Sequence, residues 1–176
     1  WNRNKYSGET AESEGLGDTK VNLFYEAFDG IQCVYKVTSW RDYIPAVYYG
    51  MSLTIPTGIS PYDDESNREI TGRGFYRLDG TVILDKTIFP WTATMLFTYG
   101  KHLERDINRE YGNYVEPYKK QLGDRSLLSI SGGYTYTFES LNTLTLTLAT
   151  SYLQEDKATI DGRTDPNSGM EKNSTT

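Results

Sequence analysis

Two adjacent runs of alternating side chains, between Ser126 and Leu153, constrain the fold of this chain more than any other feature. In each run large apolar residues occupy one parity and Ser, Thr and Gly occupy the other, and only the connector 139–141 separates the runs. A period of two indicates β-strands, and two strands joined by so short a connector predict a hairpin. The polar parity lacks the Lys and Glu that usually cover the water-facing side of a soluble sheet. Small neutral polar groups suit a crowded barrel interior, so we expect the apolar parity to face lipid.

The same alternation recurs along most of the chain. It predicts six strands, at 18–28, 46–56, 74–88, 91–103, 126–138 and 142–153. Loops are expected at 1–16, 57–73, 104–125 and 155–172. We therefore expect one all-β domain over 1–176, an antiparallel up-and-down transmembrane β-barrel.

The segment 29–43 does not fit this scheme. Asp29-Gly30 is a hairpin signal, and a seventh strand at 31–40 is a candidate. A seventh strand would put the first and second long loops on opposite sides of the membrane, so we favour a short excursion for 29–43 over a full span.

Connector lengths and aromatic residues support the barrel. From Pro56 onward the connectors alternate long, short, long, short, long, as in outer-membrane barrels with long outer loops and short periplasmic turns. Aromatic residues gather near both strand ends, as in two interfacial girdles. Those near the short turns are Phe89, Trp91, Tyr136 and Phe138, and those near the long loops are Tyr76, Tyr99 and Tyr152.

Composition excludes two classes of protein. No apolar run approaches the roughly 20 residues of a membrane helix, which excludes a helical membrane protein. A net charge of −6 and a pI near 4.9 argue against nucleic-acid binding, which needs clustered Lys and Arg. The mean hydropathy of −0.60 excludes no membrane barrel, because half of each barrel strand faces away from lipid.

No catalytic or cofactor site is expected. His102 is the single histidine and has no nucleophile motif nearby, so we expect no enzyme. Cys33 is expected to be a small packed residue. The acidic loop residues lack the spacing of a calcium loop and are expected to be solvated, with no bound metal. They are Asp63, Asp64, Glu65 and Glu69, and also Asp161, Asp165 and Asn167.

Short glycine motifs point to a family. They are Gly15-Leu16-Gly17-Asp18 opening a strand, Pro56-Thr57-Gly58 closing another, Gly72 and Gly74 before a strand that ends at Lys86, and Tyr99-Gly100. In order and spacing they resemble outer-membrane proteins grouped as the "MetA-pathway of phenol degradation" transporter-like family, over about Gly15 to Leu153. The resemblance implies a barrel similar in style to FadL, in the outer membrane of a Gram-negative bacterium. The chain departs from the family pattern at 29–43 and in lacking a terminal aromatic strand.

The expected function is a porin-like passive transporter or channel for small compounds, including aromatic or hydrophobic ones, with membrane lipid as its partner. Its lumen would be lined by Lys20, Glu26, Arg77, Asp79 and Asp85. Two alternatives remain: those charges pair and plug a purely structural barrel, or the chain is a soluble, secreted, ligand-binding β-barrel.

The expected strands are too few to close. Single-chain outer-membrane barrels have at least eight strands, and an even number of them. We read the chain as a fragment that forms a curved sheet with open edges near Asp18 and near Leu153, completed by further strands after Asn173.

Overall fold

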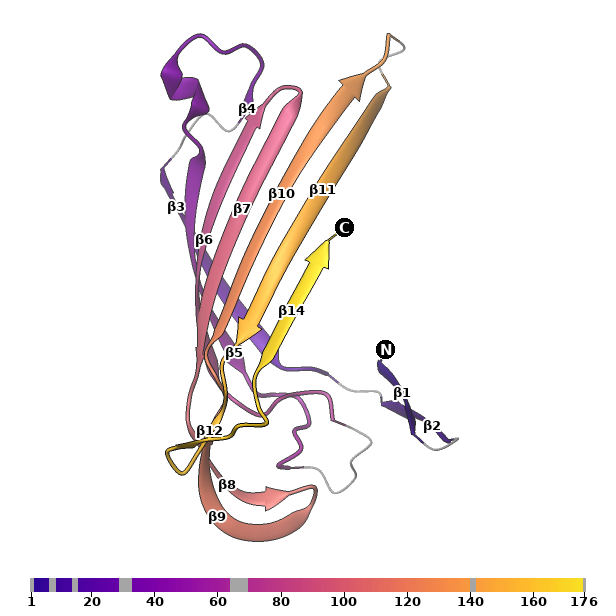
Figure 1. Ribbon diagram of the computed structural model, residues 1–176, viewed down its shortest axis with the longest axis vertical. Coiled ribbons are helices and arrows are strands. Elements are labelled where there is room, and N and C mark those ends of the chain that lie inside the picture. Colours follow the sequence, from indigo (N-terminus) through magenta and orange to yellow (C-terminus); the bar gives the residue numbers. More distant parts are fainter. Residues whose placement is uncertain are drawn as a thin grey trace.

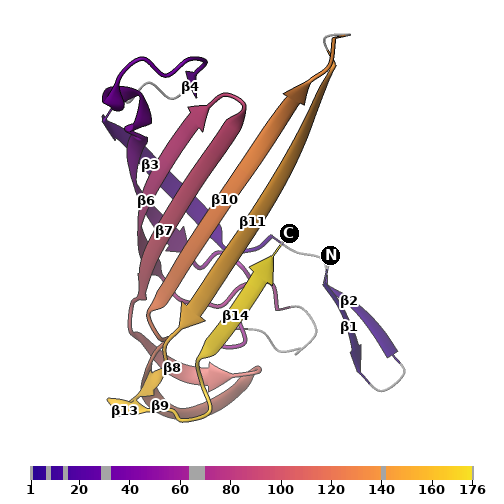
Figure 2. The ribbon, with the colours of Figure 1, turned by 45° about the horizontal axis from the view of Figure 1, so that its top comes forward.

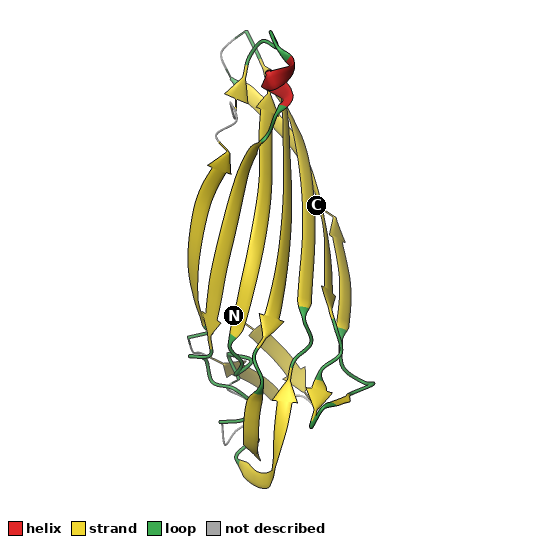
Figure 3. Cartoon of the chain, turned by 90° about the vertical axis from the view of Figure 1, so that its left-hand side faces the viewer, coloured by secondary structure: helices red, strands yellow, loops and turns green. Residues whose placement is uncertain are grey.

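A curved antiparallel sheet dominates the computed structural model, which describes residues 2–6, 9–13, 16–28, 33–63, 70–139 and 142–175. Figures 1 to 3 show its strands running side by side over most of the length of the molecule. Their order is β14-β11-β10-β7-β6-β5-β3, and all these neighbours pair antiparallel. Their bounds are β3 Thr19–Phe28, β5 Ala46–Ile55, β6 Arg77–Ile88, β7 Trp91–His102, β10 Arg125–Thr137, β11 Thr143–Glu155 and β14 Met170–Thr175. The expected all-β, antiparallel architecture is confirmed, and the six expected strands fall within a few residues of β3, β5, β6, β7, β10 and β11.

Several smaller elements accompany this sheet. The hairpin β8 (Arg105–Glu110) and β9 (Asn113–Gln121) joins β12 (Thr159–Ile160) and β13 (Arg163–Thr164) in a second sheet. That hairpin curls beneath the lower end of the large sheet in Figure 1. A separate hairpin pairs β1 (Asn2–Tyr6) with β2 (Glu9–Ser13), and β4 (Cys33–Val34) adds to β6 in parallel.

Three of the expected loops contain strands. The structure places β1 and β2 within 1–16, β8 and β9 within 104–125, and β12, β13 and the start of β14 within 155–172. The loop predictions for these segments are wrong because the sequences of their strands contain few apolar residues or are only two residues long, so they show no sustained apolar period. In 57–73 the described residues contain no strand.

The segment 29–43 contains no full strand in its described part. It forms only β4 and a single turn of 3-10 helix, Trp40–Tyr43, while the proposed turn at Asp29-Gly30 lies outside the described residues. The candidate strand at 31–40 is therefore wrong for residues 35–40, and only Cys33 and Val34 are in a strand. The expectation that Cys33 is packed is also wrong, because its side chain is exposed.

The short helix is held by its own capping carboxylate. One oxygen of Asp42 accepts hydrogen bonds from the backbone N–H of Thr38 at 2.7 Å and of Ser39 at 2.9 Å, and Ser39 in return caps the turn. Hydrogen bonds to the ionised carboxylate favour it, so these two N–H groups hold the pKa of Asp42 below its ordinary value. The cap keeps the excursion compact beside the short turns.

The edge expected near Leu153 is covered. β14 pairs with the lower half of β11, with Leu153 opposite Lys172, so the open edges of the described sheet are β3 and β14. Because β14 is short and polar, the alternation of apolar and polar residues did not predict this strand. The described strands do not close into a ring.

The glycine motifs meet around one carboxylate at the long-loop end. Asp18 accepts hydrogen bonds from the backbone N–H of Gly58 at 3.2 Å and of Arg73 at 3.0 Å. A Cβ at Gly72 would clash with this carboxylate, and one at Gly58 would clash with the backbone of Gly72. Only glycine permits this approach, which ties the start of β3 to both sides of the loop after β5.

Few apolar side chains are buried. Among the described residues only Val34, Ala46, Phe75, Ile107 and Ala158 are buried apolar groups, and three of these lie in the loops and small sheet at the long-loop end. A water-soluble domain of this length normally buries about two thirds of its surface around a core. Among the described residues no helix has the length and apolarity needed to cross a bilayer.

Candidate functional site

Charged side chains form two adjacent rows on one face of the large sheet, near the long-loop end. Strand register places Lys20, Thr54, Arg77 and His102 in the first row. It places Ser52, Asp79, Gly100, Arg125 and Glu155 in the second. All belong to the parity that carries Ser, Thr and Gly farther along the strands.

The face that carries these rows is the concave one. Arg73 donates from its backbone to Asp18, beside β3, and from its guanidinium to Glu155 on β11. β3 and β11 are five strand spacings apart, which would be about 24 Å in a flat sheet. One arginine spans that gap only because the sheet curves around it. The polar face therefore encloses a space, and the apolar face is the outer, convex one.

Asp79 is the centre of the first charge group. It is almost fully buried, and Arg77 donates to both of its oxygens, at 2.7 and 3.1 Å. Lys20 approaches the same carboxylate to 3.3 Å from β3, and Ser52 donates at 3.3 Å. The carboxylate lies over Gly100, where any Cβ would collide with it. A buried carboxylate with two cations and a hydroxyl is fully satisfied.

Glu155 is the centre of the second charge group. It too is buried, and both of its oxygens accept hydrogen bonds from Arg73 at 2.8 Å. Arg125 lies directly opposite Glu155 across the β10–β11 pair. His102 is fully buried beside them, with Nδ1 at 2.8 Å from the carbonyl oxygen of Gly123.

The five residues expected to line a lumen share the concave parity, but they do not form one cluster. Lys20, Arg77 and Asp79 come together as described. Asp85 lies toward the short turns, where it accepts a hydrogen bond from Thr94 at 2.6 Å, and Glu26 is exposed near the end of β3. The five residues therefore form one charged group of three side chains and two separate acidic side chains.

Loops and the small sheet pack together next to the charged rows. Arg105 donates to the carbonyl oxygen of Gly74 at 2.7 Å and to Asp63 at 2.8 Å, and its guanidinium lies over the Tyr62 ring. Partial burial works against ionisation of Asp63, but hydrogen bonds from Ser60 and Arg105 outweigh it and lower the pKa of Asp63. Asp63 is thus a structural acid of the loops, while Asp64, Glu65 and Glu69 lie outside the described residues.

Comparison with protein-family models found no match for this chain, and comparison with curated proteins found none. Within the described residues no three His, Cys, Asp or Glu side chains are grouped to hold a metal ion.

Sequence reasoning missed Arg73, His102, Arg125 and Glu155. Three of them continue a parity that was already visible: His102 follows Gly100, Arg125 precedes Leu127 and Ser129, and Glu155 follows Ser151 and Leu153. His102 was already inside the expected strand 91–103, and extending the expected strands 126–138 and 142–153 by one or two residues would have included Arg125 and Glu155. No sequence signal places Arg73, which reaches the site from a loop.

We predict that Arg73→Ala destabilises the fold by about 1–3 kcal/mol, because it removes the bidentate bridge that ties buried Glu155 to the loop beside β3, and a pairing of Glu155 with Arg125 would not restore that bridge. Urea unfolding in detergent micelles, followed by tryptophan fluorescence, measures this change. Lys119→Ala is the matched control, since its ion pair with Glu104 is exposed on both sides and contributes little. Equal effects of the two substitutions would show that the bridge across the concave face does not hold the curvature.

Proposed function

We propose that the large sheet is part of the wall of an outer-membrane β-barrel, and that its concave face borders a polar lumen through which small molecules pass without energy input. The observation that carries the proposal is the outer face. On each of six strands one or more outward apolar side chains are at least a third exposed, among them Leu23 at 72% and Leu148 at 67%. A patch this large is unstable in water but matches the hydrocarbon of a bilayer.

The apolar band has the height of a membrane. On β7 the outward positions from Trp91 to Tyr99 are all apolar or aromatic, and Lys101 ends this run toward the long loops. Lys86 on β6 lies opposite Ala93, within the band, and its ammonium donates to the carbonyl oxygen of Ile44. Nine residues of strand extend about 30 Å, and a tilt of about 45° reduces this to a height of about 21 Å. The hydrocarbon-facing band of outer-membrane barrels is about 25 Å tall.

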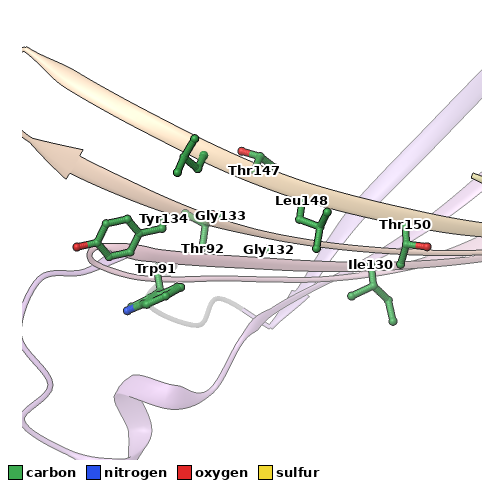
Figure 4. Close-up of a pocket in the computed structure, with 10 residues that line it drawn as sticks. Trp91, Thr92, Ile130, Gly132, Gly133, Tyr134, Thr147, Leu148 and Thr150 are labelled. Carbon is green, nitrogen blue, oxygen red and sulfur yellow. The ribbon is translucent and has the colours of Figure 1, made fainter. Parts of the chain in front are cut away.

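A shallow groove of about 510 Å³ interrupts the outer face near the short turns. Figure 4 shows Trp91, Ile130 and Leu148 on one side of the sheet and Thr147 on the other. The groove lies over Gly132, which offers no side chain there, and the rings of Trp91 and Tyr134 pack together with centroids 4.7 Å apart. An acyl chain of a lipid would fill such a depression.

The open edges support further strands. β3 and β14 are six antiparallel steps apart and so run in the same direction. An antiparallel ring therefore closes only with an odd number of additional strands, which gives an even total, as in bacterial barrels. Two copies inserted in the same orientation could pair these edges only in parallel.

The glycine motifs support a transport role of the kind found in the family they resemble. That family is similar in style to FadL-type barrels for hydrophobic compounds, and the lumen of this chain would accept small molecules, including aromatic ones, beside its charged rows. The loops and the β8–β9 hairpin lie at the same end and would form the outer entrance.

Passage is tested with the full-length chain in planar bilayers. We expect discrete conductance steps and uptake of small solutes into loaded liposomes, since the concave face carries hydroxyl, glycine and charged residues on every strand. A folded, inserted protein without conductance or solute flux would leave a structural barrel. A protein that is monodisperse without detergent would instead favour a soluble β-barrel.

The direction of the two faces has its own test. We predict that Leu146→Arg destabilises the inserted protein by about 2–4 kcal/mol, because it places a charge in hydrocarbon, whereas Thr145→Arg costs less. Refolding titrations into lipid vesicles measure both. If Thr145→Arg proved the more damaging of the pair, the apolar parity would face inward and the membrane proposal would fail.

A further inference from the structure

Arg125 is the one strand cation of the charged rows whose side chain makes no hydrogen bond or ion pair within the described residues. Asp79 is held by Arg77 and Lys20, and both oxygens of Glu155 are held by Arg73. Arg125 lies opposite Glu155 but finds its carboxylate already occupied. Its guanidinium is partly exposed on the concave face.

The surroundings of Arg125 give it a net attraction for anions. Arg77 and Arg73 act on it electrostatically with the same sign, and the two nearby carboxylates, Asp79 and Glu155, are each neutralised by other cations. A free guanidinium presents two parallel N–H donors, which match the two oxygens of a carboxylate.

An apolar patch adjoins this cation on the same face. Leu127 and Leu153 are directly opposite each other, one pleat from Arg125 and Glu155. Their row continues through Thr98, Thr81, Gly50 and Phe24 on one side and ends at Lys172 on the other. Both side chains are only partly exposed. Because these two leucines lie on the polar face, contact with lipid does not explain them. Contact with the apolar body of a bound ligand would explain them.

We propose that Arg125, with Leu127 and Leu153, forms a binding site for small monocarboxylates with an apolar body, of the size of a benzoate. The carboxylate pairs with the guanidinium of Arg125 and the apolar body covers the two leucines. The proposal rests on the proposed lumen, because it names the class of solute that the same concave face retains. The two leucines distinguish this site from a plain anion site, so we expect a monocarboxylate with an apolar body to bind better than an inorganic anion.

Binding is tested with 4-fluorobenzoate by fluorine NMR, using the full-length chain folded in detergent micelles. We expect saturable binding that Arg125→Gln weakens about tenfold or more, because a charge-assisted hydrogen-bonded pair is lost. Arg125→Lys should fall between the two, since it keeps the charge and loses the fork. Arg41→Gln, at an exposed arginine of the short helix at the opposite end, should bind like the unaltered chain.

Two further probes test whether binding needs both the negative charge and the apolar body. 4-Fluorobenzamide, which has the same body without the charge, should bind at least tenfold more weakly, and inorganic phosphate should not displace the benzoate at equal concentration. Equal binding of the amide, or unchanged binding in Arg125→Gln, would overturn the proposal.

A further variant tests whether the guanidinium of Arg125 is free to bind the probe, and it leaves Arg125 itself unchanged. Arg73→Ala frees both oxygens of Glu155, which then pair with Arg125 and exclude the probe, so binding should weaken. The double variant Arg73→Ala, Glu155→Gln should recover it. Binding that survives in Arg73→Ala as strongly as in the unaltered chain would show that Glu155 and Arg125 do not compete.

Failure here is separable from failure of the proposed function. A protein that folds in micelles, inserts and conducts, but does not bind the probe, refutes the carboxylate site alone. A protein that is monodisperse without detergent and still binds the probe refutes the membrane wall and leaves the site.

Discussion

One face of the large sheet is mostly apolar and the other is mostly polar, and the other features of the structure follow from this difference. Its outer face exposes apolar side chains on six strands, while the described residues bury only five apolar groups. No layer of the described chain covers that face. The concave face is instead filled with hydroxyls, glycines and paired charges, because curvature brings its side chains together across several strands. The bridge from Arg73 to Glu155 is the clearest result of that curvature.

Contacts at the long-loop end hold the strands of the curved sheet in place. Asp18 ties β3 to the loop after β5, and the same loop sends Arg73 across to β11. The β8–β9 hairpin adds a small core around Ile107 at that end. These contacts fix the position of the charged rows at this end of the sheet. Arg125 is the strand cation of those rows whose side chain makes no hydrogen bond or ion pair within the described residues.

The sequence predicts the long strands well and the small elements poorly, for one physical reason. A strand that separates apolar from polar surroundings alternates along its whole length, so β10 and β11 were visible with their facing and near-correct bounds. β8, β9 and β14 are shorter, carry only isolated apolar residues such as Ile107, and show no such period. The charged site was partly predictable, through Lys20, Arg77 and Asp79, because its members share a parity. Arg73 was not, since a loop residue reaches its partner only through the three-dimensional curve of the sheet.

Lipid contact of the outer face is the central claim, and fluorescence quenching measures it directly. With Cys33→Ser as the background, Leu146→Cys and Thr145→Cys are each labelled with bimane and reconstituted in vesicles that contain brominated lipid. The account predicts strong quenching by the brominated lipid at 146 and little at 145, with the reverse order for aqueous iodide. Equal quenching by the brominated lipid at both positions, or stronger quenching at 145, would contradict it.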